Sequence, residues 1–519
     1  MKKILINKFA TAALITSLIL GTGCAKIDDF GSRNQDPNGI TTPVTSALLT
    51  NTLSGIGGFA AVLRTAVYSQ YVAENQYTDV SLNSLPLLEM GGAYSGNLQD
   101  LQTIISYNTD PKTASIAAAN GSNANQIAIA RILKAFIYWQ TTDRWGDIPY
   151  SQALQGASFL NPKFDKQEDI YFDMIKECKE AVASMDNGAT VRGDILYGSS
   201  GSQVNNWKKL GNSLRMLMAM RLTKRYPAAG GKAALEFADA INGSGGIIDD
   251  NSANMTLAYP GGFYRSPWYN VYETRDDYAS SKTLGDVLTG LGDTRSTVFG
   301  TNSVMFPTGL TRDLAIAYGN SVGNGQSRVL AVSKRTESSP VVIIGASTVL
   351  LARAEAKERG WIAGGTAGAQ ADYNAAIAAS FAQWGVNMPG TYLNSGGGAN
   401  YNDGTGVAGG PTGIGSAPAP YDNFRVASGN VQDAVTTTKL QRIALQRWIA
   451  AFPNGNEGWA ELRRTGVPNL KDTRFATGAT VRRYVYGNND YGLNNANTLE
   501  AAGRLTGGDK QESRIWWNN

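Results

Sequence analysis

Apolar side chains recur at every third or fourth position along much of this chain, which is the spacing of amphipathic helices. One such stripe contains Ile132, Phe136 and Trp139, and it ends at the sequence DRWGDIP, where Gly146 and Pro149 are stop signals. Further apolar stripes follow at 171–185, 207–217, 235–237, 347–361, 373–385 and 445–452. The pattern therefore predicts a mainly α-helical chain.

The predicted helices often occur in pairs, as at 347–361 and 373–385. Helix pairs that cannot each bury an apolar face alone are typical of tetratricopeptide-like repeats. Strand signals are few, and PVVIIG at 340–345 is the clearest of them. The stretch 385–420 is dominated by Gly, Asn, Ser and Pro, which predicts a long loop region between the helices.

The first 23 residues follow a different pattern. Three lysines precede an apolar stretch at 9–20, and small residues then lead into Cys24. This is the layout of a secretory signal, and the stretch is too short to span a bilayer as a helix. A cysteine directly after the small residues resembles the bacterial lipobox, in which the thiol is acylated and cleavage makes the cysteine the first residue. We therefore expect a lipoprotein signal peptide at 1–23 and one mature domain at 24–519, without a later apolar run of this kind.

The chain has only two cysteines, Cys24 and Cys178. Each buried methylene of an acyl chain contributes about 0.8 kcal/mol, so two or more chains on Cys24 hold a protein at a membrane. A disulfide between the two cysteines is the alternative, but two cysteines in so long a secreted chain do not form a disulfide framework. Cys178 lies on the apolar stripe 171–185, so we expect it to be a buried core residue.

The composition excludes several classes of function. The 519 residues contain no histidine, which removes Ser-His-Asp and Cys-His nucleophile systems, HExxH zinc sites and His-ligated metals. The net charge of +4 indicates no strong attraction to nucleic acid. Histidine-dependent catalysis and histidine-ligated metals are therefore not expected, and we assign no metal-ligating residue and no cofactor to the chain. A glycosidase with two carboxylates is the open alternative, although adjacent acids such as Asp276 and Asp277 are usually only solvated in a polar loop.

Two short motifs have a structural interpretation that we prefer to the functional one. In SGIGGFAAVL, Gly55, Gly57 and Ala60 fit a relaxed dinucleotide fingerprint, but no β-strand precedes them, so a close helix contact explains the small residues better. NEGWAELRRTG contains Arg463 and Arg464, and its spacing predicts a short helix that stabilises the fold, with arginine stems covering aromatic faces.

The segment YPGGFYRSPWYNVYETRDDY, at 259–278, is rich in aromatic residues and contains Tyr264, Trp268, Tyr269 and Tyr272. Its spacing fits neither a helical stripe nor an alternating strand, which predicts a loop. Aromatic faces stack on sugar rings, while Tyr, Asn and Asp bond sugar hydroxyls, and the same groups suit a peptide backbone. The alternative is that the rings attach a long loop to the helical body. We regard Trp268 as the best candidate for a ligand contact.

Several segments together resemble one family, the SusD/RagB nutrient-binding outer-membrane lipoproteins. Besides the lipobox at Cys24, they are NQDPNGI (34–40), RILKAFIYWQTTDRWGDIPYSQAL (131–154), NNWKKLGNSLRMLMAMRL (205–222), LGDVLTGLGDTR (284–295), LLARAEAKERGW (350–361) and LQRWIAAFPNGNEGWAELRRTGVPNL (445–470). They occur in order over most of the chain, so the set is specific although each segment alone is modest.

The resemblance implies a SusD-like body of tetratricopeptide-like helix pairs that carries an irregular, loop-rich ligand-binding region. It implies that Tyr77, Asp79 and Tyr94 face the ligand, together with the region of Trp268. It also implies a partner, a SusC-like TonB-dependent transporter, and no catalysis. The acids Asp28 and Asp29 resemble the surface-export signal of Bacteroidetes lipoproteins.

These expectations combine into a lipid-anchored protein of the outer membrane, exposed at the cell surface. It binds oligosaccharides, or oligopeptides as the RagB-like alternative, and delivers them to the transporter. A surface glycosidase and a helical scaffold that binds only proteins are the two rival hypotheses.

Overall fold

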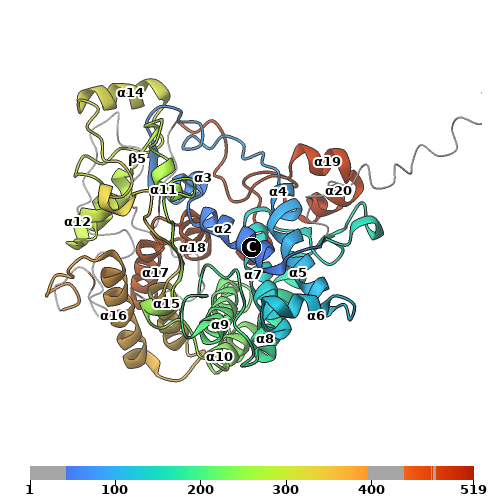
Figure 1. Ribbon diagram of the computed structural model, residues 1–519. Coiled ribbons are helices and arrows are strands. Elements are labelled where there is room, and N and C mark those ends of the chain that lie inside the picture. The colour runs from blue at the N-terminus through green and yellow to red at the C-terminus, as the bar shows by residue number, and fades with distance from the viewer. Residues whose placement is uncertain (1–41, 395–398, 400–437, 469, 471–474) are drawn as a thin grey trace, which may run out of the picture. The chain divides into compact units, whose positions relative to one another are not determined.

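The computed structural model describes residues 42–394, 399, 438–468, 470 and 475–519 (Figure 1). The chain divides into two units, Met1–Val44 and Thr45–Asn519. The fold described below is that of the second unit. The predictions for the signal peptide, for Cys24 and for most of the loop at 385–420 lie outside the described residues.

Helices form the body of this unit. They are α2 (Thr45–Ile56), α3 (Leu63–Tyr68), α4 (Gly91–Ala93), α5 (Gln99–Thr109), α6 (Ala114–Ala117), α7 (Asn123–Trp145), α8 (Gln167–Ser184), α9 (Gln203–Arg221), α10 (Lys232–Ile241), α11 (Pro267–Asn270), α12 (Lys282–Leu291), α13 (Ser296–Phe299), α14 (Arg312–Ser321), α15 (Ala346–Glu358), α16 (Gly365–Trp384), α17 (Thr438–Ala451), α18 (Gly455–Thr465), α19 (Asn488–Leu493) and α20 (Asn495–Arg504). The prediction of a mainly α-helical fold is confirmed.

Strands are short and occur as three antiparallel pairs in the described residues. They are β1 (Val72–Glu74) with β5 (Tyr278–Ser280), β2 (Ile148–Pro149) with β3 (Phe164–Asp165), and β4 (Met255–Leu257) with β6 (Val341–Ile344). The last strand is the one that PVVIIG predicts. Each pair joins two segments that connect helices. None of the three pairs extends into a larger sheet.

The predicted helix pairs are present, with α7 packed on α8, α9 on α10 and α15 on α16. The helix α7 ends where the sequence predicts, because Gly146 adopts a φ of +90°, which an α-helix does not allow. Cys178 lies on the buried face of α8 with a free thiol. Burial raises the pKa of this thiol to about 12, so it is a core group without nucleophilic character.

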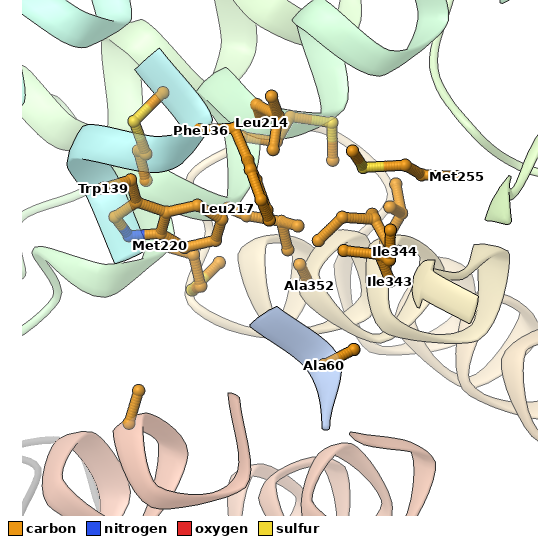
Figure 2. Close-up of a cluster of buried hydrophobic side chains, with 14 of the residues drawn as sticks. Ala60, Phe136, Trp139, Leu214, Leu217, Met220, Met255, Ile343, Ile344 and Ala352 are labelled. Carbon is orange, nitrogen blue, oxygen red and sulfur yellow. The ribbon is translucent and has the colours of Figure 1, made fainter. Parts of the chain in front are cut away.

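The core runs continuously between these pairs. Figure 2 shows where side chains from α7, α9, β4, β6 and α15 converge, namely Phe136, Trp139, Leu214, Leu217, Met220, Met255, Ile343, Ile344 and Ala352. These residues come from parts of the sequence more than 200 positions apart. One contiguous core therefore joins the N-terminal and C-terminal helix pairs.

The segment Thr45–Tyr68 is long and apolar enough to cross a membrane by length and composition, contrary to the expectation that no later apolar run exists. In the structure it is not one helix, because a 3₁₀ turn at Gly57–Ala60 separates α2 from α3. Leu53 and Ile56 are fully buried, as in a core helix.

Gly57 explains the small residues in SGIGGFAAVL. A Cβ atom at this position would lie 2.0 Å from the hydroxyl oxygen of Tyr259, so no side chain fits there. The close contact is thus with a tyrosine that follows β4, where the sequence predicted a contact between helices.

A network of buried charges lies among α9, α15, α17 and α18. Its members are Arg221, Glu355, Arg447, Glu457, Glu461 and Arg464. Arg464 is fully buried and donates to both oxygens of Glu355 at 2.7 Å, and to Glu461 at 2.7 Å. Arg447 donates to Glu461 at 2.7 Å, while Arg221 donates to Glu457 and Glu461 at 2.9 Å.

The arginines of this network keep its buried carboxylates ionised. Burial alone would raise the pKa of Glu355, but the positive charges of Arg464 and Arg359 outweigh burial and lower it to about 2. The network therefore keeps this carboxylate ionised inside the protein. It also confirms the structural interpretation of NEGWAELRRTG, which is the helix α18, with Arg463 stacked 3.7 Å from the centre of the Trp459 ring.

The network predicts that loss of a buried ion pair lowers the free energy of unfolding much more than loss of an exposed one. Arg464→Met removes the fully buried cation that bonds both Glu355 and Glu461, which then keep only Arg359, and Arg447 with Arg221, as partners. We therefore expect a loss of about 3 to 5 kcal/mol in the free energy of unfolding. Arg131→Met removes a half-buried arginine from Glu177 and Glu180, and we expect it to cost about 1 kcal/mol or less. Urea unfolding of both variants measures the difference, and equal losses would contradict the role given to the network.

Candidate functional site

The aromatic segment, residues 259–278, connects β4 to β5. A tight turn at its start places Gly261 and Gly262 at φ of +87° and +66°, which favours glycine at both positions. Glu337 holds the turn, because one of its carboxylate oxygens accepts the N–H of Gly262 at 3.0 Å. Phe263 follows directly and is fully exposed.

Phe263 is therefore a surface aromatic residue on a rigid turn. A fully exposed ring adds nothing to the core, and such residues mark interaction sites when they lie among other aromatic side chains. The sequence interpretation did not include Phe263 among the ligand-binding residues. The signal was the pair of glycines before it, which predicts a turn that projects the next side chain.

Tyr264 and Tyr269 are half-buried at the base of this turn. The hydroxyl of Tyr264 donates to the carbonyl of Ser54 in α2 at 2.8 Å, which attaches the segment to the helical body. The guanidinium of Arg265 lies 5.2 Å from the centre of the Tyr269 ring and forms two hydrogen bonds, of 2.6 and 2.9 Å, with Glu273. Both rings are fixed in orientation and keep part of their surface exposed.

Tyr272 is an anchor of the segment. Its hydroxyl accepts the N–H of Val329 at 2.8 Å and donates to the carbonyl of Tyr278 at 3.1 Å. Burial raises the pKa of this phenol, so it stays protonated and keeps both bonds. Arg335 and Arg328 flank the ring at 4.7 and 5.4 Å from its centre.

Trp268 differs most from its expected position. The segment forms one helical turn here, α11, with Pro267 at its first position, although the sequence predicts a loop. This turn directs Trp268 into the body, where only 2% of the residue is exposed. The tryptophan is thus not a surface platform in this structure, because the short helix turns it toward the core.

The pairing of β1 with β5 brings a second loop to the aromatic segment. Glu74 lies opposite Tyr278 in this pairing, so Tyr77 and Asp79 follow close to the end of the segment. Tyr77 is 56% exposed, and the guanidinium of Arg275 lies 5.0 Å from the centre of its ring. Asp79 is exposed as well. The structure therefore brings together these two residues and the segment 259–278, which are about 200 positions apart.

Tyr94 does not join this group. Its hydroxyl donates to the carbonyl of Pro149 at 2.7 Å, and its ring packs edge-on against Tyr138 of α7 at 6.0 Å. Burial raises the pKa of Tyr94 well above its ordinary value. Its contacts are those of a residue that attaches the turn after α4 to the helical body.

The acids Asp276 and Asp277 pair with different arginines. Arg328 bonds Asp276 at 2.8 Å, and Arg275 bonds Asp277 at 2.5 Å. Each carboxylate is therefore paired with its own arginine, whereas glycoside hydrolysis needs two carboxyl groups that both face the substrate. Among the described residues, no group of three or more Asp, Glu, Cys or His side chains could hold a metal ion.

Glu74 is the buried titratable group beside this site. The N–H of Ser81 donates to its carboxylate at 2.8 Å, which ties β1 to the loop that carries Tyr77 and Asp79. Burial is the largest effect on Glu74 and raises its pKa to about 7, although Ser81 and Arg64 oppose the rise. The loop is therefore held by a group that titrates close to neutral pH.

Comparisons with known proteins agree with this architecture. A family model described as "Starch-binding associating with outer membrane" matches residues 37–487. A SusD homologue from Bacteroides uniformis superposes with a TM-score of 0.72 at 24% identity, covering 92% of this chain and 100% of that one. A chitin-binding SusD homologue from Flavobacterium johnsoniae gives 0.68 at 24% identity, covering 92% and 98%.

A SusD homologue from Bacteroides fragilis gives a TM-score of 0.69 at 21% identity, covering 92% of this chain and 100% of that one. At these identities the structural matches show a shared fold. None of the proteins with curated functions matches the sequence. The family assignment therefore rests on the sequence model, and the architecture on the solved structures.

The raised pKa of Glu74 predicts a pH-dependent contribution to stability. The folded protein binds this proton more tightly than the unfolded chain, so the contribution is complete below pH 4.5 and declines as the pH rises through about 7. Glu74→Gln should remove the decline. We expect the difference in unfolding free energy between the variant and the wild type to change by about 3 kcal/mol over this range. Urea unfolding across the range measures it, and parallel curves would exclude this role.

Proposed function

Because the chain belongs to the SusD-like family, we propose that it is a cell-surface lipoprotein that binds oligosaccharides and delivers them to a SusC-like TonB-dependent transporter. The family match over residues 37–487 carries this proposal. The family model's description, starch binding and association with the outer membrane, supports a glycan ligand and a membrane location. A solved relative named as chitin-binding supports a glycan in the same way.

The proposed ligand surface consists of the exposed rings of the aromatic segment and of the loop that meets the end of this segment. Phe263 and Tyr269 lie on the segment itself, and Tyr77 and Asp79 lie on the loop that follows β1. Exposed rings offer flat apolar faces to the C–H faces of sugars, while the carboxylate of Asp79 accepts hydrogen bonds from sugar hydroxyls. Tyr264 and Tyr272 position this surface through their hydroxyl bonds and contribute the exposed parts of their rings.

The aromatic segment has little net charge, because each of its acids has an arginine partner. Glu273, Asp276 and Asp277 pair with arginines in this way. A neutral surface with aromatic faces suits a neutral glycan. A peptide backbone offers similar hydrogen-bonding groups, so the oligopeptide ligand remains the second candidate within the same family.

Stacking at this surface predicts selective losses of affinity. We expect Phe263→Ala and Tyr269→Ala each to weaken binding of chitin or starch oligosaccharides about three- to tenfold, since an aromatic contact contributes about 0.5 to 1.5 kcal/mol. Phe159→Ala, which removes an exposed ring from another loop, is the control and should leave the affinity unchanged. Isothermal titration calorimetry of the purified protein measures all three.

Three results would redirect the proposal. Equal affinity of the three variants would remove the aromatic segment from the ligand surface. Release of new reducing ends from a glycan by the pure protein would favour the glycosidase hypothesis. Binding of peptides but of no glycan would favour the oligopeptide ligand.

The lipid anchor is a separate part of the proposal, and it concerns Cys24. We expect the mature chain to begin at Cys24 and to carry acyl chains, because two or more chains are needed for stable attachment to a bilayer. Cys24→Ala should abolish membrane association, whereas Cys178→Ala, which changes a buried core cysteine, should not. Mass spectrometry of the mature N-terminus and fractionation of membranes test this, and a membrane-bound Cys24→Ala protein would contradict it.

A further inference from the structure

A cavity of about 200 Å³ lies on the inner side of the aromatic segment, where Trp268 forms part of its wall. Other parts of the wall come from β6, from the end of α16 and from the junction of α17 and α18. Its apolar lining includes Trp384, Ile343, Phe452 and Pro453. Protein interiors rarely leave voids larger than a water molecule, and a cavity of about 150 Å³ accepts a benzene ring. The space is therefore sufficient for one six-membered ring with a substituent.

Three residues of this lining carry buried polar atoms without a hydrogen-bond partner among the described residues. They are the indole nitrogens of Trp268 and Trp384 and the side-chain oxygen of Gln383. An unpaired buried polar group costs about 1 to 3 kcal/mol, so most proteins pair such groups. Their concentration around one cavity is what a binding site shows when its ligand is not part of the structure.

The charged groups of the lining favour an anion. Lys334 makes no ion pair or side-chain hydrogen bond with the described residues, and its ammonium group lies beside Gly385 at the end of α16. Glu457 is the acid of the lining, but Arg221 binds its carboxylate at 2.9 and 3.1 Å. The positive charge of Lys334 is therefore the one available to a ligand.

We propose that this cavity binds a small carboxylate with one apolar ring. The ring packs on the apolar side chains of the wall, such as Phe452. The carboxylate accepts hydrogen bonds from the ammonium group of Lys334 and from an unpaired indole N–H of the wall. The cavity site is separate from the proposed glycan surface and does not depend on it.

The test compares benzoate with benzamide, which has the same ring and shape but no charge. Titration calorimetry with the full mature protein should show that benzoate binds more tightly than benzamide. Lys334→Gln should lower the affinity for benzoate at least about fivefold, as expected for the loss of a charge-assisted hydrogen bond. The affinity for benzamide should be unchanged. Lys112→Gln, at an exposed lysine elsewhere, is the control.

A second variant tests the location of the site. Thr348 lies in the cavity wall on α15, so Thr348→Trp should fill the space and abolish binding of both probes. The melting temperature of this variant shows that it is folded. The proposal is overturned if neither probe binds at millimolar concentration, if folded Thr348→Trp binds both, or if Lys334→Gln weakens both probes equally. Glycan titrations of the same variants should be unchanged, which separates this result from failure of the proposed function.

Discussion

The buried network of Arg221, Glu355, Arg447, Glu461 and Arg464 is the constraint on which the arrangement of the helices depends. An unpaired charge in the interior costs several kcal/mol, so α9, α15, α17 and α18 are compatible with only one relative placement. These helices are distant in the sequence, and α9 ends more than 200 residues before α17 and α18 begin. Hydrophobic burial brings them together, but it is tolerant of small shifts, whereas bidentate pairs between guanidinium and carboxylate groups are directional. The network therefore fixes the junction between α17 and α18, which together with β6 forms part of the cavity wall that contains Trp268.

The aromatic segment uses its residues in two ways on this scaffold. Tyr264, Tyr272 and Trp268 attach it to the body, through hydroxyl bonds in the first two and through burial in the third. Phe263 and Tyr269 remain at the surface because the glycine turn and the Arg265–Glu273 pair hold them there. A binding surface made of fixed rings loses little conformational entropy when a ligand binds, which suits capture of a ligand by weak stacking contacts.

Composition could identify the segment 259–278 as unusual, but it could not divide the segment into anchors and exposed rings. Trp268 follows a proline among polar residues, which is typical of a surface position. A single helical turn nevertheless directs it inward. Tyr94 shows the same limit, since its partners Tyr138 and Pro149 lie on elements that only the folded chain brings near. Phe263 could have been recognised from the two glycines before it, because a turn of that kind leaves the following side chain without neighbours.

The sequence by itself determined the helical class, the pairing of the helices, the end of α7 at Gly146, the strand at 341–344, the burial of Cys178 and the family. These features depend on local periodicity, on turn residues and on motifs that occur in order along the chain, all of which can be seen without the fold. Only the tertiary structure decided that β1 meets β5, so that Tyr77 lies near a segment 200 residues away, and that Trp268 lines a cavity beside Lys334. Such contacts depend on how elements that are distant in the sequence pack against one another. This packing is a property of the whole chain, because no single segment contains both partners of such a contact.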